Sequence, residues 1–157
     1  MTVADERGHM TLDGRAAARG AGPRQAVELI PAECWGLLRE ARLGRIVFTM
    51  HARPAIRPVN HLVDGHVIVI RSQLGSAITG HASQDGAVVC YEADEIDPDR
   101  HTGWSVVATG LARLVRDPGL ANRYQQQLEP WAAGDMAQVI AITPQTITGI
   151  RLVGWCS

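Results

Sequence analysis

The chain has 157 residues, of which 46% are hydrophobic and 20% are charged, and this is the size and composition of one globular domain. All 15 basic residues are arginine, which excludes Schiff-base lysine chemistry and the phosphate-binding lysine of a Walker A loop. The formal net charge of −1 provides no overall field that favours nucleic acid or an anionic membrane, and we expect neither as a partner.

The cysteines and the amino terminus indicate the compartment. Cys34, Cys90 and Cys156 are far apart and form no C-x-x-C motif. The amino terminus lacks the apolar core of a signal peptide, and no apolar run approaches the roughly 18 residues of a membrane span. These features are typical of a reduced, cytoplasmic protein whose thiols are small buried apolar groups.

The first residues differ in character from the rest of the chain. Residues 1–26 mix glycine, alanine, arginine and acidic residues without apolar periodicity, which predicts a flexible tail ahead of one domain over residues 27–157. A short helix is expected from Pro31 to Arg42, because proline suits the first turn of a helix. We expect Gly44 to end this helix.

Most of the remaining sequence is typical of strands. β-Branched runs predict strands over residues 45–50, 55–63, 66–71, 87–94, 104–115, 137–143 and 146–153. Between them we expect a hairpin turn at Asp64-Gly65, one or two helical turns within 75–83, an acidic loop over 94–100, a bulge at Gly110 and a helix over 117–128. Because turns recur every eight to twelve residues or so, antiparallel pairing is favoured. The sequence predicts a mainly β fold with a few helices, built as a six-stranded antiparallel barrel.

A candidate anion site lies where a strand runs into a helical turn. Arg71 offers a rigid fork of donors that suits a phosphate, and Ser72 adds a hydroxyl group. Gly75 would let backbone amides near Ser76 approach an anion at a helix N-terminus. An exposed arginine followed by an ordinary polar turn gives the same pattern, and for this stretch alone it is the more frequent outcome.

A second candidate is the strand segment from Arg57 to Asn60. Pro58 has no N–H group, so the strand must be edge-like or bulged at that point. Backbone groups freed at Val59 and Asn60 could bond the edge of a planar heterocycle. A simple kink at a sheet edge explains the segment better when it is taken alone.

Other side chains provide weaker signals. Trp104 begins a strand and could cover a ring or a subunit interface, although a tryptophan there is more often part of the core. The six histidines show no metal-ligand spacing, so we expect no metal site. The sequence contains neither G-x-S-x-G nor G-x-G-x-x-G, and no catalytic residue can be assigned.

Several short motifs follow one another in a characteristic order. They are Glu33-Cys-Trp-Gly-Leu-Leu, Leu43-Gly-Arg-Ile-Val, Ile56-Arg-Pro-Val-Asn, Ile70-Arg-Ser-Gln-Leu-Gly-Ser, Val89-Cys-Tyr-Glu-Ala-Asp and Gly103-Trp-Ser-Val-Val-Ala-Thr-Gly. Together they resemble the pyridoxamine 5′-phosphate oxidase-like family of flavin-nucleotide-binding split barrels, and most closely its nitroimidazole-resistance-type branch. The resemblance extends over about residues 28–153.

The resemblance implies a six-stranded split β-barrel and a homodimer that holds FMN in clefts at the subunit interface. By this resemblance, Arg57, Pro58, Val59 and Asn60 lie along the isoalloxazine ring of the cofactor. Arg71 and Ser72 face its phosphate, and Gly75 and Ser76 close around that phosphate. Trp104 lies near the ring or the dimer interface.

One position departs from the family pattern. Family members commonly place a lysine after the Gly-Ser of the phosphate loop, and this chain has Ala77 there. Losing one charge-assisted contact weakens binding by about ten- to a hundredfold. Either another arginine compensates, or FMN binds weakly, or the cofactor is different.

The function expected from the resemblance is that of an FMN-dependent oxidoreductase with a small-molecule substrate or electron donor. One alternative replaces FMN with a deazaflavin. Another is a non-catalytic module that binds a flavin or haem, with His61 or His66 as the haem ligand. Oxidation of pyridoxamine phosphate is disfavoured, because basic residues for a phosphate can be identified with conviction at one site only.

Overall fold

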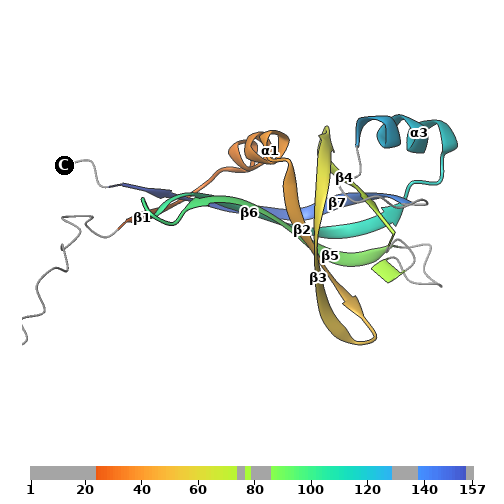
Figure 1. Cartoon of the computed structure of the whole chain (residues 1–157), viewed down its shortest axis with the longest axis horizontal. Coiled ribbons are helices and arrows are strands. Elements are labelled where there is room, and N and C mark those ends of the chain that lie inside the picture. Colours follow the sequence, from red (N-terminus) through yellow and green to blue (C-terminus); the bar gives the residue numbers. More distant parts are fainter. Residues whose placement is uncertain (1–23, 74–76, 79–85, 129–137, 155–157) are drawn as a thin grey trace, which may run out of the picture.

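Strands make up most of the described part of the chain (Figure 1). The computed structural model describes residues 24–73, 77–78, 86–128 and 138–154. The elements in chain order are β1 (Gln25–Glu28), α1 (Pro31–Glu40), β2 (Leu43–Met50), β3 (Arg53–Asp64), β4 (Val67–Ser72), β5 (Ala87–Asp97), β6 (Thr102–Leu114), α3 (Pro118–Gln127) and β7 (Gln138–Val153).

The described strands form one antiparallel sheet in the order β1-β7-β4-β3-β2-β5-β6. Because β7 also pairs with β6, the strands β2 to β7 close into a ring of six, and β1 joins β7 outside the ring. The hydrophobic core fills the ring, with Ile46, Tyr91 and Ile140 fully buried. The prediction of a mainly β, six-stranded antiparallel split barrel is therefore confirmed.

The long strand β7 pairs with three other strands along its length. Its first residues pair with β4, its middle with β6 and its end with β1, whose Gln25 lies opposite Val153. The sequence predicted two strands here, interrupted near Pro144, and this prediction is wrong. The register shift between Thr109 and Gly110 leaves Gln145 of β7 without a partner in this ladder, so the irregularity expected at Gly110 is present, with its extra residue on β7, and β7 continues past Pro144. A side chain at position 110 would collide with the carbonyl oxygen of Thr143.

Other predicted boundaries shift by a few residues. β5 extends through Asp97 into the stretch expected to be an acidic loop. α1 ends at Glu40, because Ala41 is already extended, and Gly44 lies inside β2 instead of ending the helix. The strand β1 begins within the predicted tail, at Gln25. The rest of that tail, residues 1–23, lies outside the described residues.

α1 and α3 each begin with a capping hydrogen bond from a side chain. At the start of α1 the Glu33 carboxylate accepts a 3.0 Å hydrogen bond from the backbone N–H of Ile30, and Asp117 accepts one of 2.7 Å from Leu120 at the start of α3. α1 buries Cys34, Trp35 and Leu38 in the core. Among the described residues, no helix is long and apolar enough to cross a membrane.

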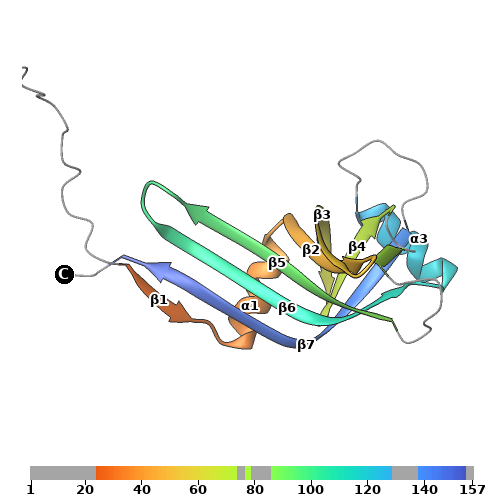
Figure 2. The ribbon, with the colours of Figure 1, turned by 90° about the horizontal axis from the view of Figure 1, so that it is seen from below.

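α3 covers a second, smaller apolar cluster. Its Tyr124 and the following Leu128 pack against Val69 of β4 and Val139 of β7. This cluster lies outside the ring, because its strand residues alternate with those that face the barrel core. The β6–β7 part of the sheet extends well beyond the barrel toward β1, where it forms an arm (Figure 2).

Candidate functional site

Two of the predicted site segments meet where β3 and β4 diverge. The ladder between these strands runs from Asp64 opposite Val67 to His61 opposite Ile70 and ends there. Beyond that point β4 continues to pair with β7 on its other side. β3 continues to pair with β2 alone. The structure therefore places the segment from Arg57 to Asn60 and the pair Arg71 and Ser72 on the two sides of one opening, which we call the split.

Arg71 has an unusual environment in the split. Its side-chain Nε atom is buried and has no hydrogen-bond partner among the described residues. A buried donor without a partner costs about 1–3 kcal/mol, so such groups are rare unless a ligand or water completes them. The neighbouring Ser72 is only 8% exposed. An anion bound in the split would supply the acceptor that Arg71 lacks.

The rest of the predicted phosphate loop is described only in part. Gly75 and Ser76 lie outside the described residues, so their role remains a prediction. Ala77 and Ile78 form part of a helical turn, where Ala77 is half-buried and Ile78 is buried. The chain therefore re-enters the core immediately after the predicted loop.

The β3 side of the split offers mainly backbone. Arg57 and Pro58 are exposed, whereas Val59 and Asn60 are half-buried. The Arg57 guanidinium donates a 2.7 Å hydrogen bond to the carbonyl oxygen of Ile56, its own neighbour. The predicted edge character of this strand segment is present, because the ladder with β4 stops before Asn60.

Trp104 lies away from the other predicted residues within one chain. It is near the start of β6, opposite Glu95 of β5 and Arg151 of β7. That end of β6 belongs to the arm, which leads away from β3 and β4 (Figure 2). Trp104 packs on the edge of the core and is half-buried. Within a single chain, two of the three predicted site segments therefore lie together, and Trp104 lies apart from them.

A buried pair next to the split was missed as a functional feature in the sequence. Nδ1 of His61 lies 2.7 Å from the Tyr91 hydroxyl, and Nε2 lies 2.7 Å from the carbonyl oxygen of Leu38. The Tyr91 hydroxyl is also 3.4 Å from the carbonyl oxygen of Val59. Burial lowers the pKa of His61 and raises the pKa of Tyr91. Strand alternation places both residues on the inner face and is the one sequence signal for the pair.

These contacts decide how the histidines can act. Both ring nitrogens of His61 are engaged, so neither is available as a haem ligand in this arrangement. His66 is exposed, and its ring stacks on Trp35 with the centroids 5.1 Å apart. Neither histidine therefore shows the open, inward-facing nitrogen that axial ligation of haem requires.

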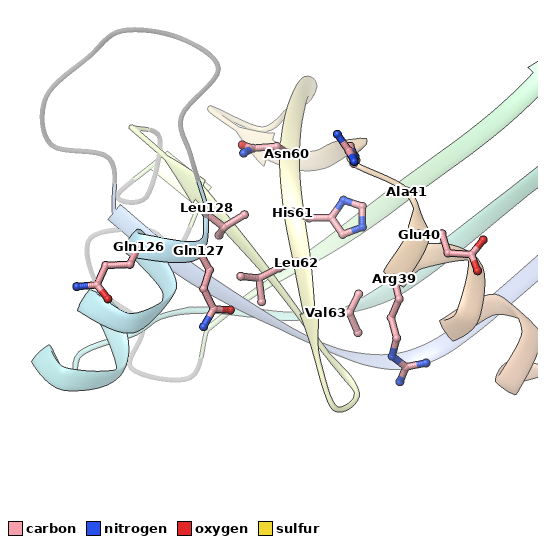
Figure 3. A pocket seen from close by; sticks show the side chains of 11 residues that line it. Arg39, Glu40, Ala41, Asn60, His61, Leu62, Val63, Gln126, Gln127 and Leu128 are labelled. Carbon is pink, nitrogen blue, oxygen red and sulfur yellow. The ribbon is translucent and has the colours of Figure 1, made fainter.

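A pocket of about 690 Å³ lies along β3, between the end of α1 and the end of α3 (Figure 3). β3 forms its floor, the end of α1 one wall and the end of α3 the other. At one end both helices are tied to the β3–β4 turn, because Arg39 donates to the Gly65 carbonyl and Tyr124 to the Asp64 carboxylate. At the other end the pocket reaches Asn60 and thus the split. Its lining residues are Arg39, Glu40, Ala41, Arg42, Asn60, His61, Leu62, Val63, Gln126, Gln127 and Leu128.

The closed ring of six strands, opened where β3 and β4 diverge, defines the class of split β-barrel proteins. Within that class, the family model described as pyridoxamine 5′-phosphate oxidase matches residues 31–151. The chain belongs to the pyridoxamine 5′-phosphate oxidase-like family, which confirms the resemblance found in the sequence motifs.

Comparisons with individual proteins agree with this assignment. The chain is 51% identical over 134 residues to the uncharacterized protein Rv0080 of Mycobacterium tuberculosis, covering 83% of this chain and 88% of that one. A Corynebacterium glutamicum structure, whose name also refers to pyridoxamine 5′-phosphate oxidase, is 30% identical with a TM-score of 0.67, covering 81% of this chain and 98% of that chain. The FAD-binding protein of Mycobacterium smegmatis is 31% identical with a TM-score of 0.59 and the same coverage.

Proposed function

We propose that the protein binds a flavin nucleotide in the split between β3 and β4 and acts as a flavin-dependent oxidoreductase. The observation that carries the proposal is the buried, unpartnered Nε of Arg71 at the point where the β3–β4 ladder ends. The family membership supports it, and so does the FAD-binding protein of Mycobacterium smegmatis, a structural neighbour at 31% identity.

Each side of the split has a distinct task in this proposal. Arg71 and Ser72 hold the phosphate, and Gly75 and Ser76 close around it. The β3 segment from Arg57 to Asn60 lies along the isoalloxazine ring and bonds its polar edge through backbone groups. The flavin supplies the hydride or electron chemistry when it is bound, and the protein binds it, orients it and shields it from water.

The choice of flavin depends on the phosphate end. FMN is the cofactor expected from the sequence, but Ala77 supplies no cation at the position where the family commonly has one. FMN ends in a phosphate monoester, whereas FAD carries a pyrophosphate group with less charge per phosphate. FAD is therefore a second candidate, and the neighbour that is named for FAD binding favours it. A deazaflavin differs from both in its longer acidic tail.

We also propose that the protein is a homodimer. Ile56 is 53% exposed and Val88 is 66% exposed. Val47 lies opposite Ile56 on one side and Cys90 on the other, so these four residues form one apolar patch across the outer face of β2, β3 and β5. A second copy would cover this patch. Sedimentation equilibrium tests the dimer, and Val88→Glu should shift it to the monomer.

The central experiment is the absorption spectrum of the purified protein, followed by separate titrations with FMN, FAD and a deazaflavin. We expect flavin absorption in the visible range or quenching of added flavin fluorescence. Addition of NADPH or NADH should then bleach the bound flavin. The absence of both absorption and quenching would contradict flavin binding, and binding without bleaching by either donor would favour a non-catalytic module.

A further inference from the structure

We propose that the pocket between α1, β3 and α3 is the substrate site of the flavin chemistry, and that it takes a small organic anion with a carboxylate or phosphate group. This inference rests on the proposed function, because it is the flavin in the split that would make a ligand of this pocket a substrate. Its volume of about 690 Å³ falls within the range of small-molecule sites.

The position of the pocket is the first argument. β3 provides both the strand segment next to the split and the pocket floor from Asn60 to Val63 (Figure 3). Asn60 belongs to both, so a ligand lying on this floor has one end at the split. At the opposite end, Arg39 contacts Gly65 and Tyr124 contacts Asp64 in the β3–β4 turn. The pocket therefore adjoins the proposed ring position at its Asn60 end.

The charge of the α1 wall is the second argument. Arg39 and Arg42 line this wall together with one carboxylate, that of Glu40. In Figure 3 the Glu40 side chain extends away from β3. Arg42 forms no hydrogen bond or ion pair with any described residue, and Arg39 commits one nitrogen to the Gly65 carbonyl. Since a guanidinium group has five N–H donors, this wall retains most of its capacity to bind an anion.

The opposite wall and the floor accommodate the rest of such a ligand. Gln126 and Gln127 present side-chain amides from the end of α3. Leu62 and Leu128 lie between β3 and α3, and Val63 faces α1 (Figure 3). The wall with arginines, the apolar side chains of Leu62, Val63 and Leu128, and the wall with amides together match a molecule with one anionic group and an apolar body. The structure thus contains a second basic pair, which the sequence analysis did not recognise.

His61 sets a limit on the chemistry in this pocket. It lines the pocket, but its ring nitrogens are engaged with Leu38 and Tyr91. It therefore has no free N–H group or lone pair with which to bind the substrate or transfer a proton to it. Recognition of the anionic group therefore falls to the arginines.

Calorimetry with defined probes tests this proposal. Benzoate and phenyl phosphate are the anionic probes, and benzamide is the neutral comparator of similar shape. Each is titrated into the flavin-loaded and the flavin-free protein. Arg42→Gln removes the unpaired charge, and Arg116→Gln is a matched control, because Arg116 is an exposed arginine that does not line this pocket. The side-chain amide resonances of Gln127 in ¹⁵N-correlated NMR spectra report whether the probe occupies the pocket.

We expect at least one anion to bind about tenfold or more tightly than benzamide and to shift the Gln127 amide resonances. Arg42→Gln should weaken the binding of that anion by about tenfold or more, since the substitution removes a charge-assisted contact. Arg42→Gln should change the benzamide affinity by less than about twofold and leave the flavin affinity unchanged. Arg116→Gln should leave the affinities for the anion, benzamide and the flavin unchanged. Equal binding of anion and amide, no effect of Arg42→Gln, or no binding of either anion would overturn the proposal.

Flavin binding is scored separately in the same samples. If the protein binds flavin but fails these anion tests, the proposed function is supported and the proposed substrate site is refuted. If the protein binds benzoate through Arg42 but binds no flavin, the anion site is supported. The proposed function is then refuted, and so is the role of the pocket as a substrate site. The two failures are therefore distinguishable.

Discussion

The hydroxyl group of Tyr91 donates a 2.7 Å hydrogen bond to Nδ1 of His61 inside the barrel. Nε2 of the same ring carries the proton, because its partner 2.7 Å away, the carbonyl oxygen of Leu38, can only accept. The pair links β5 to β3 and β3 to the end of α1. His61 is also the last residue of the β3–β4 ladder. It thus anchors β3 at the position where the proposed flavin segment begins.

Tyr91→Phe should destabilise the protein by about 1–3 kcal/mol, because it leaves Nδ1 of His61 buried without a donor. Urea denaturation followed by circular dichroism measures the change in the free energy of unfolding. Tyr124→Phe is the matched control: its hydroxyl donates to Asp64 at a half-exposed turn, where water can replace the lost contact. A smaller loss for Tyr91→Phe than for Tyr124→Phe would show that the buried pair contributes little.

The lowered pKa of His61 predicts a pH dependence of stability. Between the folded and unfolded pKa values the unfolded chain binds more protons, so the free energy of unfolding decreases as the pH falls through about 6.5. The decrease levels off below the folded pKa, and its slope is at most about 1.4 kcal/mol per pH unit. His61→Gln should abolish this component, whereas His66→Gln should preserve it. Identical pH profiles for wild type and His61→Gln would refute the assignment.

Two glycine substitutions should have effects of opposite sign. A Cβ atom at Gly44 would collide with the Tyr91 hydroxyl and the Glu92 backbone, so Gly44→Ala should cost about 1–3 kcal/mol and disturb the Tyr91–His61 pair. A Cβ atom at Gly36 in α1 meets nothing within 4 Å. Gly36→Ala should therefore stabilise the helix by about 0.5–1 kcal/mol. Thermal unfolding of both variants checks the prediction, and a neutral Gly44→Ala would mean that Tyr91 moves aside at little cost.

The sequence determined the strand content and much of the split, because both depend on local patterns. Alternation identified the strands, and Pro58 indicated an edge where the β3–β4 ladder in fact ends. The sequence did not predict that β7 continues past Pro144. The continuation depends on pairing with β6, which is far away in sequence and whose register skips Gln145 of β7. The pocket was missed for the same reason. Its walls come from α1 and α3, and the chain segments between them determine neither their distance nor their orientation.

Arg71→Ala should weaken flavin binding by about 2 kcal/mol or more, which is roughly thirtyfold. The folded state should lose little stability, because the substitution also removes the unpartnered buried Nε. Fluorescence quenching of the added flavin measures the dissociation constant, and Arg116→Ala controls for a general loss of positive charge. An unchanged dissociation constant in Arg71→Ala would place the phosphate site elsewhere.

Ala77→Lys should restore the cation that family members commonly carry after the Gly-Ser of the phosphate loop. Ala77 is half-buried, and a lysine can extend from such a position to place its ammonium group at the surface. One added charge-assisted contact should tighten FMN binding by about ten- to a hundredfold. FAD should gain less, because each phosphate of its pyrophosphate group carries less charge than the phosphate monoester of FMN. Parallel titrations of both flavins with wild type and Ala77→Lys measure the difference. An equal gain for the two flavins would indicate a general electrostatic effect, whereas no gain for FMN would mean that position 77 does not face the phosphate.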